Sequence, residues 1–309
     1  MQQHHRKLTR AAVLLTTLAT SGAAVVHLAQ AQDAPTRARD NGAVVAIAQA
    51  HPASTHYSFV RLDGPARTAV MDDNARLVAM FTDGARTAVL SGQSRTFTDP
   101  RRTSAVVTTS NWVRLAPQPW KAGAEKESWF RPWLGEALAD RSPDVLAVAT
   151  QYVTFAHYAD DADYSDFLGI TNKGVKPRKD RFGDVDSAGY VRLVYGYRLG
   201  YPIGAGGLPR TPQEMPTAPL GAAIADNAVG SPQTRFLAQP GDLLLFSTDG
   251  SKGAVDHVGI YLGVDDAGQQ RFIASRGTPN GPSFGDSSGR SVLDDDGPYA
   301  AGLWGIRRL

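Results

Sequence analysis

The pattern of apolar and polar positions divides the chain into a β-rich first half and a mixed second half. From Tyr57 to about Ala116, short runs rich in Val, Thr and Phe alternate with turn residues, which predicts a series of strands. Asp83-Gly84 lies between two of these runs and is a strong signal for a β-hairpin turn. We therefore expect a small β-rich unit of about 60 residues in this region, a size within the range of small domains.

A helix is predicted after residue 185. Its buried face is marked by apolar residues at i, i+3, i+4 and i+7 spacing, namely Tyr190, Leu193, Val194 and Tyr197. Asp186 is a good N-cap, and Gly200 is a plausible C-terminal stop. Ser187 is therefore expected in the first turn of a half-buried helix, where free N–H groups and the helix dipole favour negative charge.

Other elements of the second half follow from caps and turns. Ser142-Pro143 predicts the start of an earlier helix, because Ser is favoured as N-cap and Pro at the first helical position. Buried strands are predicted at 243–246, 256–263, 270–275 and 302–309. Helices followed by antiparallel strands indicate an α+β fold.

The chain start indicates export. Arg6, Lys7 and Arg10 precede an apolar run that ends in Ala29-Gln30-Ala31, the pattern of a cleavable secretory signal. The alternative is a membrane anchor, which the many small residues and the lack of a charged stop disfavour. Export predicts a secreted protein with no membrane span after cleavage.

Five segments result from these patterns. They are a signal peptide (1–31), a lead-in or linker (32–55), the small β-rich subdomain (56–116), a Trp/Pro-rich connection (117–141) and the main domain (142–309). For the β-rich subdomain, a structural role is favoured over targeting to the cell wall, because its sequence contains no residues typical of a functional site. For Trp120, Trp129 and Trp133, interdomain packing is favoured over stacking on sugars.

Composition limits the chemistry. Removal of the three basic residues of the signal changes the formal net charge from +2 to −1. The remaining chain contains no basic block that would indicate binding to nucleic acid. The chain has no cysteine, which excludes disulfides, thiol nucleophiles and Cys-based metal sites. His51 and His56 lack the spacing of a zinc site, and the acidic loop 160–166 lacks the pattern of a calcium-binding EF-hand. No metal and no cofactor is predicted.

The order of motifs in residues 142–309 resembles the NlpC-type family of bacterial cell-wall peptidases, which have a papain-like α+β fold. The motifs that carry the resemblance are Asp186-Ser187-Ala188-Gly189, Pro240-Gly241-Asp242-Leu243, Asp256-His257-Val258-Gly259-Ile260-Tyr261, Phe272-Ile273-Ala274-Ser275 and Arg307-Arg308. The resemblance implies that Ser187 occupies the position of the family's nucleophilic cysteine and His257 the position of its base. The position that orients the imidazole falls on Ala274, which has no polar side chain.

These departures determine the predicted function. A serine needs a well-placed base, and losing the group that orients that base lowers rates by about 10⁴. Our first expectation is an exported papain-like protein that acts on or binds peptidoglycan stem peptides, with hydrolysis doubtful. The alternatives are an active peptidase that uses a Ser187–His257 dyad and a structural surface protein. No Gly-x-Ser-x-Gly elbow and no phosphate-binding loop is present in the sequence.

Overall fold

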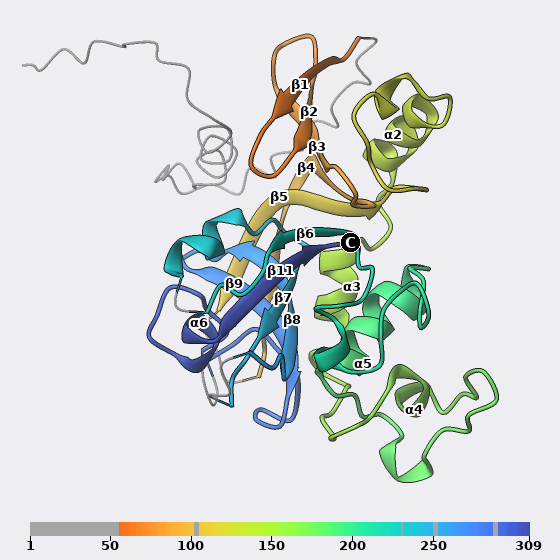
Figure 1. The fold of residues 1–309 in the computed structure, drawn as a ribbon, viewed down its shortest axis with the longest axis vertical. Helices are drawn as coiled ribbons and strands as arrows, with labels where there is room; N and C mark the ends of the chain where they lie inside the picture. Colours follow the sequence, from red (N-terminus) through yellow and green to blue (C-terminus); the bar gives the residue numbers. More distant parts are fainter. Residues whose placement is uncertain (1–55, 102–104, 230, 250–252, 287–289) are drawn as a thin grey trace, which may run out of the picture.

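The computed structural model describes residues 56–309 apart from 102–104, 230, 250–252 and 287–289. The predicted signal peptide (1–31) and lead-in (32–55) lie outside the described residues. Two antiparallel sheets and several short helices make up the described part, so the α+β fold class is confirmed (Figure 1).

The first sheet is a five-stranded meander in the β-rich half. Its strands are β1 (Ser58–Leu62), β2 (Arg67–Met71), β3 (Leu77–Thr82), β4 (Thr87–Thr98) and β5 (Val106–Leu115). The predicted Asp83-Gly84 turn joins β3 to β4, and Gly84 has a φ of 85°, which favours glycine. Runs predicted as separate strands are continuous in β4 and β5, because a bulge between Ser91 and Arg95 bends the pair without ending it.

The tryptophans pack against this first sheet. Trp120 is 1% exposed and stacks on Phe81 of β3, with ring centroids 4.2 Å apart. Helix α2 (Phe130–Ala139) adds Trp133, and Trp129 precedes it; their ring centroids are 6.1 Å apart. Trp120 belongs to the core of the β-rich half, and Trp129 and Trp133 pack against it. The rings therefore pack within this half and not between domains, which corrects the prediction, and packing accounts for them better than a sugar-binding surface does.

The second sheet has six strands in the order β10-β9-β8-β7-β11-β6. Their bounds are β6 (Ala222–Ala225), β7 (Leu243–Phe246), β8 (His257–Val264), β9 (Gln270–Arg276), β10 (Gly281–Ser283) and β11 (Leu303–Arg308). The helices of this half are α3 (Val145–Gln151), α4 (Tyr164–Leu168), α5 (Ser187–Val191) and α6 (Pro298–Ala301). Short 3-10 turns are η1 (Ala124–Lys126), η2 (Lys179–Arg181), η4 (Pro212–Glu214) and η5 (Pro232–Leu237).

The predicted helix after residue 185 changes its winding midway. It begins as α5 and continues as the π-helical segment η3 (Arg192–Arg198), with Gly200 at a φ of 73° just beyond its end. The wider turn changes which residues face inward, so Tyr195 is fully buried whereas Tyr197 is 50% exposed. The prediction that Tyr197 lies on the buried face is therefore wrong, although the helix and its ends are as predicted.

The two faces of the second sheet carry different cores. Val258 and Ile260 of β8 belong to the larger core, which α3, α5 and η3 cover. Tyr261 of β8 and Phe272 of β9 belong to a smaller core on the other face, together with Tyr299 of α6. Alternation along a strand produces this division, because successive side chains point to opposite faces.

The β-rich half shares the larger core. Val107 and Val113 of β5 are fully buried in it, on the N-terminal side of the predicted 141/142 domain boundary. Asp144, the N-cap of α3, accepts hydrogen bonds from the Val113 amide and from Arg95 of β4, each at 2.6 Å. Asp144, and not Ser142, therefore caps this helix, and its carboxylate also ties α3 to the hairpin β4–β5.

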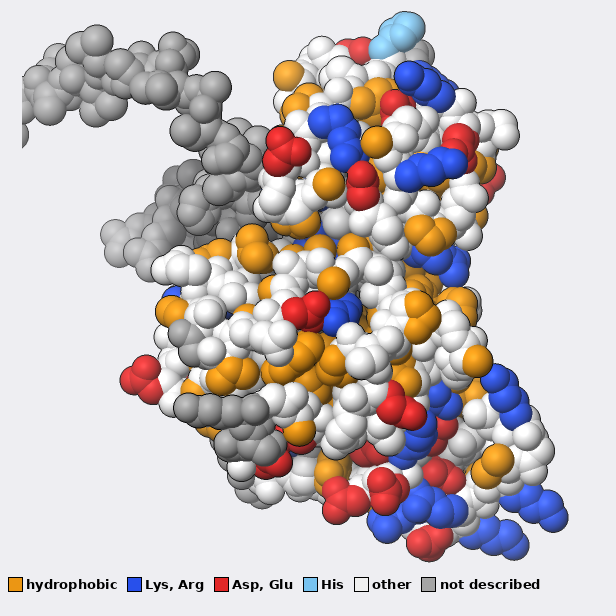
Figure 2. Space-filling view, in the orientation of Figure 1, with side chains coloured by type: hydrophobic (Ala, Val, Ile, Leu, Met, Phe, Trp, Pro, Cys, Tyr) orange, Lys and Arg blue, Asp and Glu red, His pale blue; other side chains and the backbone are white. Residues whose placement is uncertain are grey.

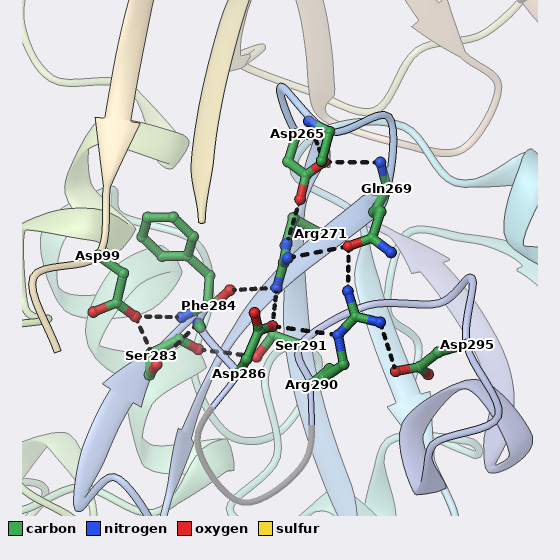
Figure 3. Close-up of polar contacts among 12 residues, drawn as sticks. Asp99, Asp265, Gln269, Arg271, Ser283, Phe284, Asp286, Arg290, Ser291 and Asp295 are labelled. Atoms are coloured by element: carbon green, nitrogen blue, oxygen red, sulfur yellow. Dashed lines mark hydrogen bonds and ion pairs between the residues drawn. The ribbon is translucent and has the colours of Figure 1, made fainter. Parts of the chain in front are cut away.

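A second contact between the β4–β5 hairpin and the second half of the chain lies where β4 ends. Asp99, which follows β4, accepts hydrogen bonds from Ser283 Oγ at 2.6 Å and from the Phe284 amide at 2.9 Å (Figure 3). Nearby, buried Arg271 forms ion pairs with Asp265 at 2.7 Å and with Asp286 at 2.6 Å (Figure 3). The hairpin is thus fixed to the second sheet by buried polar contacts as well as by apolar packing.

Charged side chains are unevenly spread over the surface. Figure 2 shows Lys, Arg, Asp and Glu gathered at the lower right, where Figure 1 places α4 and its flanking loops. Among the described residues, no group of three or more His, Asp or Glu side chains is arranged to hold a metal ion. No helix in the described part of the chain has both the length and the apolar character needed to cross a membrane.

Candidate functional site

Ser187 is the first residue of α5, as the sequence predicts. The Asp186 side chain caps the helix by accepting a hydrogen bond from the Gly189 amide at 2.6 Å. Ser187 is 4% exposed, so its hydroxyl group lies in a buried first turn. Burial raises the pKa of Asp186, and the ion pair with Arg210 partly opposes this rise.

Two close contacts hold the start of α5 in place. Ser275 of β9 donates a hydrogen bond from its hydroxyl to the Val185 carbonyl at 2.7 Å. Gly189 packs so tightly that a Cβ there would lie 2.3 Å from the Ala162 carbonyl oxygen, so no larger residue fits without movement. The family-like Asp-Ser-Ala-Gly segment is therefore clamped between β9 and the loop that precedes α4.

His257 is the first residue of β8, and its side chain belongs to the smaller core. It pairs with Phe246 of β7, and residues opposite each other across a pair share a face. Its ring centroid lies 5.4 Å from that of Tyr299 and 6.3 Å from that of Phe246. Helix α5 covers the other face, so His257 points away from the layer that contains Ser187.

The imidazole lies in an environment that keeps it neutral. Burial, with a smaller effect from the nearby Arg276 guanidinium, lowers the pKa of His257 to about 3. The Nε2 atom is buried and has no hydrogen-bond partner among the described residues. Such an imidazole is a poor proton acceptor, because its conjugate acid is strongly disfavoured.

Neither Ala274 nor Asp256 orients the His257 imidazole. Ala274 belongs to the same core as Phe246 and Tyr299, so it lies on the face of His257 but presents only a methyl group. The Asp256 carboxylate is used in the adjacent loop, where it accepts hydrogen bonds from the Thr248 and Asp249 amides, both at 2.8 Å. No described side chain therefore serves as the third member of a catalytic triad.

The two predicted site residues differ in their surroundings. Within the described residues, no hydrogen bond joins Ser187 to His257. The ring neighbours of His257 belong to the smaller core, whereas Ala188 and Tyr190 of α5 belong to the larger core. Among the described residues, no hydrogen bond pairs the Ser187 hydroxyl with a general base, and a serine hydroxyl without a base is a weak nucleophile.

Several residues that sequence reasoning did not single out support the site. Arg210 donates to Asp186 at 2.7 Å, and Arg192 of η3 forms a buried ion pair with Asp163 at 2.8 Å. Asp163 and Asp166 form a capping box at the start of α4, so half of the acidic cluster has a structural role. No sequence signal pairs Arg210 with Asp186 or Arg192 with Asp163, because these partners lie 24 and 29 positions apart.

The chain was compared with protein families, curated proteins and solved structures. Residues 173–289 match the NlpC/P60 family. A structure of NlpC1 from Trichomonas vaginalis aligns with 82% of this chain and 80% of that chain, at 15% sequence identity and a TM-score of 0.32. A search of curated proteins found no match. On the family match, the chain contains an NlpC/P60 family domain at residues 173–289.

Proposed function

We propose that this protein is exported and binds peptidoglycan stem peptides at the cell wall through its NlpC/P60 domain, without hydrolysing them. The family domain supports a cell-wall, peptidase-like role. The signal pattern in residues 1–31 supports export. The observation that carries the absence of hydrolysis is the position of His257, whose ring packs against Tyr299 on the sheet face away from α5.

Three chemical features point in the same direction. The chain has no cysteine, so the thiolate used by the resembled family is missing. The lowered pKa of His257 makes its imidazole a weak base. Ala274 cannot hold an imidazole in the correct tautomer, a function that normally requires a hydrogen-bond acceptor.

The test uses the mature chain, residues 32–309, and purified peptidoglycan. Soluble peptides released from the wall are measured by mass spectrometry, and bound protein is measured by co-sedimentation. We expect co-sedimentation without release. Release that disappears in Ser187→Ala would instead establish a serine-dependent hydrolase, and the absence of both signals would favour a structural surface protein.

Export has its own measurement. N-terminal sequencing of the secreted protein is expected to begin at or near Gln32, directly after the Ala29-Gln30-Ala31 site. Recovery of the intact start in a membrane pellet would contradict the proposal, because it would mean that the apolar run is retained as an anchor.

A further inference from the structure

The segment between α4 and α5 exposes both basic and apolar side chains. Residues 173–182 contain five basic residues and one acidic residue, which gives a formal charge of +4. Figure 1 shows this segment beside α4 at the lower right of the molecule, and Figure 2 shows Lys and Arg side chains gathered there. We call residues 173–182 the basic loop.

Three of the five cations in the basic loop are not neutralised by the protein. Arg178 pairs with Asp166 at 3.3 Å, and Arg181 lies 3.7 Å from Asp180. No described carboxylate forms an ion pair with the exposed lysines of the loop, which are Lys173, Lys176 and Lys179. Their ammonium groups face water in the unbound protein, so they can approach an external anion with little loss of internal contacts.

Two apolar side chains of the same loop are also in water. Val175 is 70% and Phe182 is 71% exposed, the two largest exposed fractions among the large apolar side chains of the described residues. Gly169, which ends α4, has a φ of 65°, and a Cβ there would lie 3.2 Å from the Phe182 ring. The ring therefore lies against the end of α4 and exposes the rest of its surface.

A second exposed ring comes from the segment that follows α3. Phe155 is 58% exposed and lies two residues before His157, just as Phe182 lies two residues before Asp184. His157 and Asp184 form a parallel bridge, in which the His157 amide donates to the Gly183 carbonyl at 2.9 Å. The two segments thus approach the bridge in the same direction, and both exposed rings lie close to it.

The combination of lysines and exposed rings narrows the class of partner. Lysine is depleted in protein–protein interfaces, so the lysines disfavour a protein partner. A soluble polyanion would use the lysines and leave the apolar side chains in water, where their exposure is unfavourable. A membrane surface uses both groups, because anionic headgroups attract Lys and Arg while aromatic and aliphatic side chains enter the boundary with the acyl chains.

We propose that the basic loop, together with Phe155, is a docking surface for an anionic lipid bilayer. The lysine ammonium groups bind lipid phosphates, and Val175 and Phe182 enter the region between the headgroups and the acyl chains. Each lysine held near an anionic surface strengthens binding by about fivefold. The contact is peripheral and requires no membrane span. It goes beyond the proposed function, because it uses neither Ser187 nor a peptide ligand.

Sedimentation with vesicles tests the proposal. Residues 32–309 are used, because the apolar run of the predicted signal would itself bind lipid. Vesicles of phosphatidylcholine are compared with vesicles of equimolar phosphatidylcholine and phosphatidylglycerol, which are anionic. We expect the anionic vesicles to bind about a hundredfold more tightly, through the three lysines. Added salt should weaken this binding, because it screens exposed charges.

Substitutions in the loop separate the two contributions. Lys176→Gln combined with Lys179→Gln should weaken binding to the anionic vesicles by about twentyfold. Phe182→Ser should weaken it by about tenfold, because the ring no longer leaves water on binding. Since these side chains are exposed, the variants should fold as the native chain does, and thermal melting curves check this.

Matched controls come from exposed residues elsewhere. Lys126→Gln combined with Arg131→Gln removes two cations from the β-rich half, and Phe236→Ser removes an exposed ring of η5. Both controls should bind the anionic vesicles as the native chain does. Losses equal to those of the loop variants would show that net charge or total apolar surface determines binding, and that the loop is not the docking surface.

Three results would overturn the proposal. They are equal sedimentation with both kinds of vesicle, sedimentation with neither, and binding that is unchanged in Phe182→Ser but abolished by inorganic polyphosphate. The last result would make the loop a site for a soluble polyanion instead of a bilayer. Because the vesicles contain no peptidoglycan, each of these results would leave the peptide-binding proposal standing.

Discussion

The imidazole of His257 and the phenol ring of Tyr299 pack together with centroids 5.4 Å apart and ring planes inclined at 43°. This contact places the family's base position inside the smaller core. Phe246 and Phe272 complete the aromatic group, with centroids 4.9 Å apart. The pair therefore places the residue predicted as the base in the apolar packing of the smaller core.

The first prediction concerns stability at acidic pH. His257 is neutral when folded, with its pKa lowered from 6.5 to about 3. Between these two values the unfolded chain binds the proton and the folded chain does not, so folding stability falls as the pH decreases from about 6.5 towards 3. Urea unfolding at several pH values should show a steeper loss in the native chain than in His257→Gln. Equal slopes would show that the imidazole titrates normally.

A second prediction tests whether Ser187 and His257 are separated by the sheet. Ser187→Cys introduces the chain's one thiol, and the iodoacetamide rate against pH reports its apparent pKa. Adding His257→Ala should leave this pKa unchanged, because the imidazole is uncharged and lies on the other face. A rise of about one pKa unit in the double variant would instead mean that an imidazolium stabilises the thiolate, and the hydrolytic dyad would become the better interpretation.

The third prediction concerns Asp144, which is fully buried. Its carboxylate accepts from Arg95, from the Val113 amide and, as N-cap, from the Ala147 amide at 3.0 Å. Asp144→Ala should lower the free energy of unfolding by about 3–5 kcal/mol, because it removes the ion-pair partner of the half-buried Arg95 guanidinium and the acceptor of two amides. Asp144→Asn, which keeps one acceptor oxygen, should cost less. Urea denaturation measures the free energy of unfolding of both variants. Equal losses in the two would show that the negative charge of Asp144 does not contribute to stability.

The sequence predicted the elements that depend on local pattern. The Asp186 cap, the Gly200 stop and the Asp83-Gly84 turn are all present, because each depends on residues within one turn of the chain. The burial of Tyr197 was predicted wrongly, because the spacing of apolar residues does not reveal that η3 winds as a π-helix.

The candidate site was less accessible to sequence reasoning. The motif order placed Ser187 at the start of its helix and His257 at the start of its strand, but motif order does not specify which face of the sheet each side chain occupies. Tyr299, the ring partner of His257, lies 42 positions further along the chain in a segment without a motif. Burial by such distant residues sets the lowered pKa of His257, so no local pattern could have revealed it.

The last prediction concerns the proposed boundary between residues 141 and 142. A fragment that starts at residue 142 lacks Val107 and Val113, which are fully buried in the larger core, and loses the partners of Asp144. Burial of each valine contributes about 1.5–3 kcal/mol. Their loss is therefore a large part of a typical stability of about 5–15 kcal/mol.

We expect residues 56–309 to unfold in one cooperative transition and residues 142–309 alone to lack one. Circular dichroism in the near ultraviolet during heating distinguishes the two, since it reports fixed packing of aromatic side chains. Adding separately produced residues 56–141 should restore the transition if the core is shared, and this mixture controls for damage caused by truncation itself. A fragment 142–309 that melts cooperatively without the β-rich half would show that the valines of β5 only cover a core that is already complete, and that the boundary at residue 141 separates two independent domains.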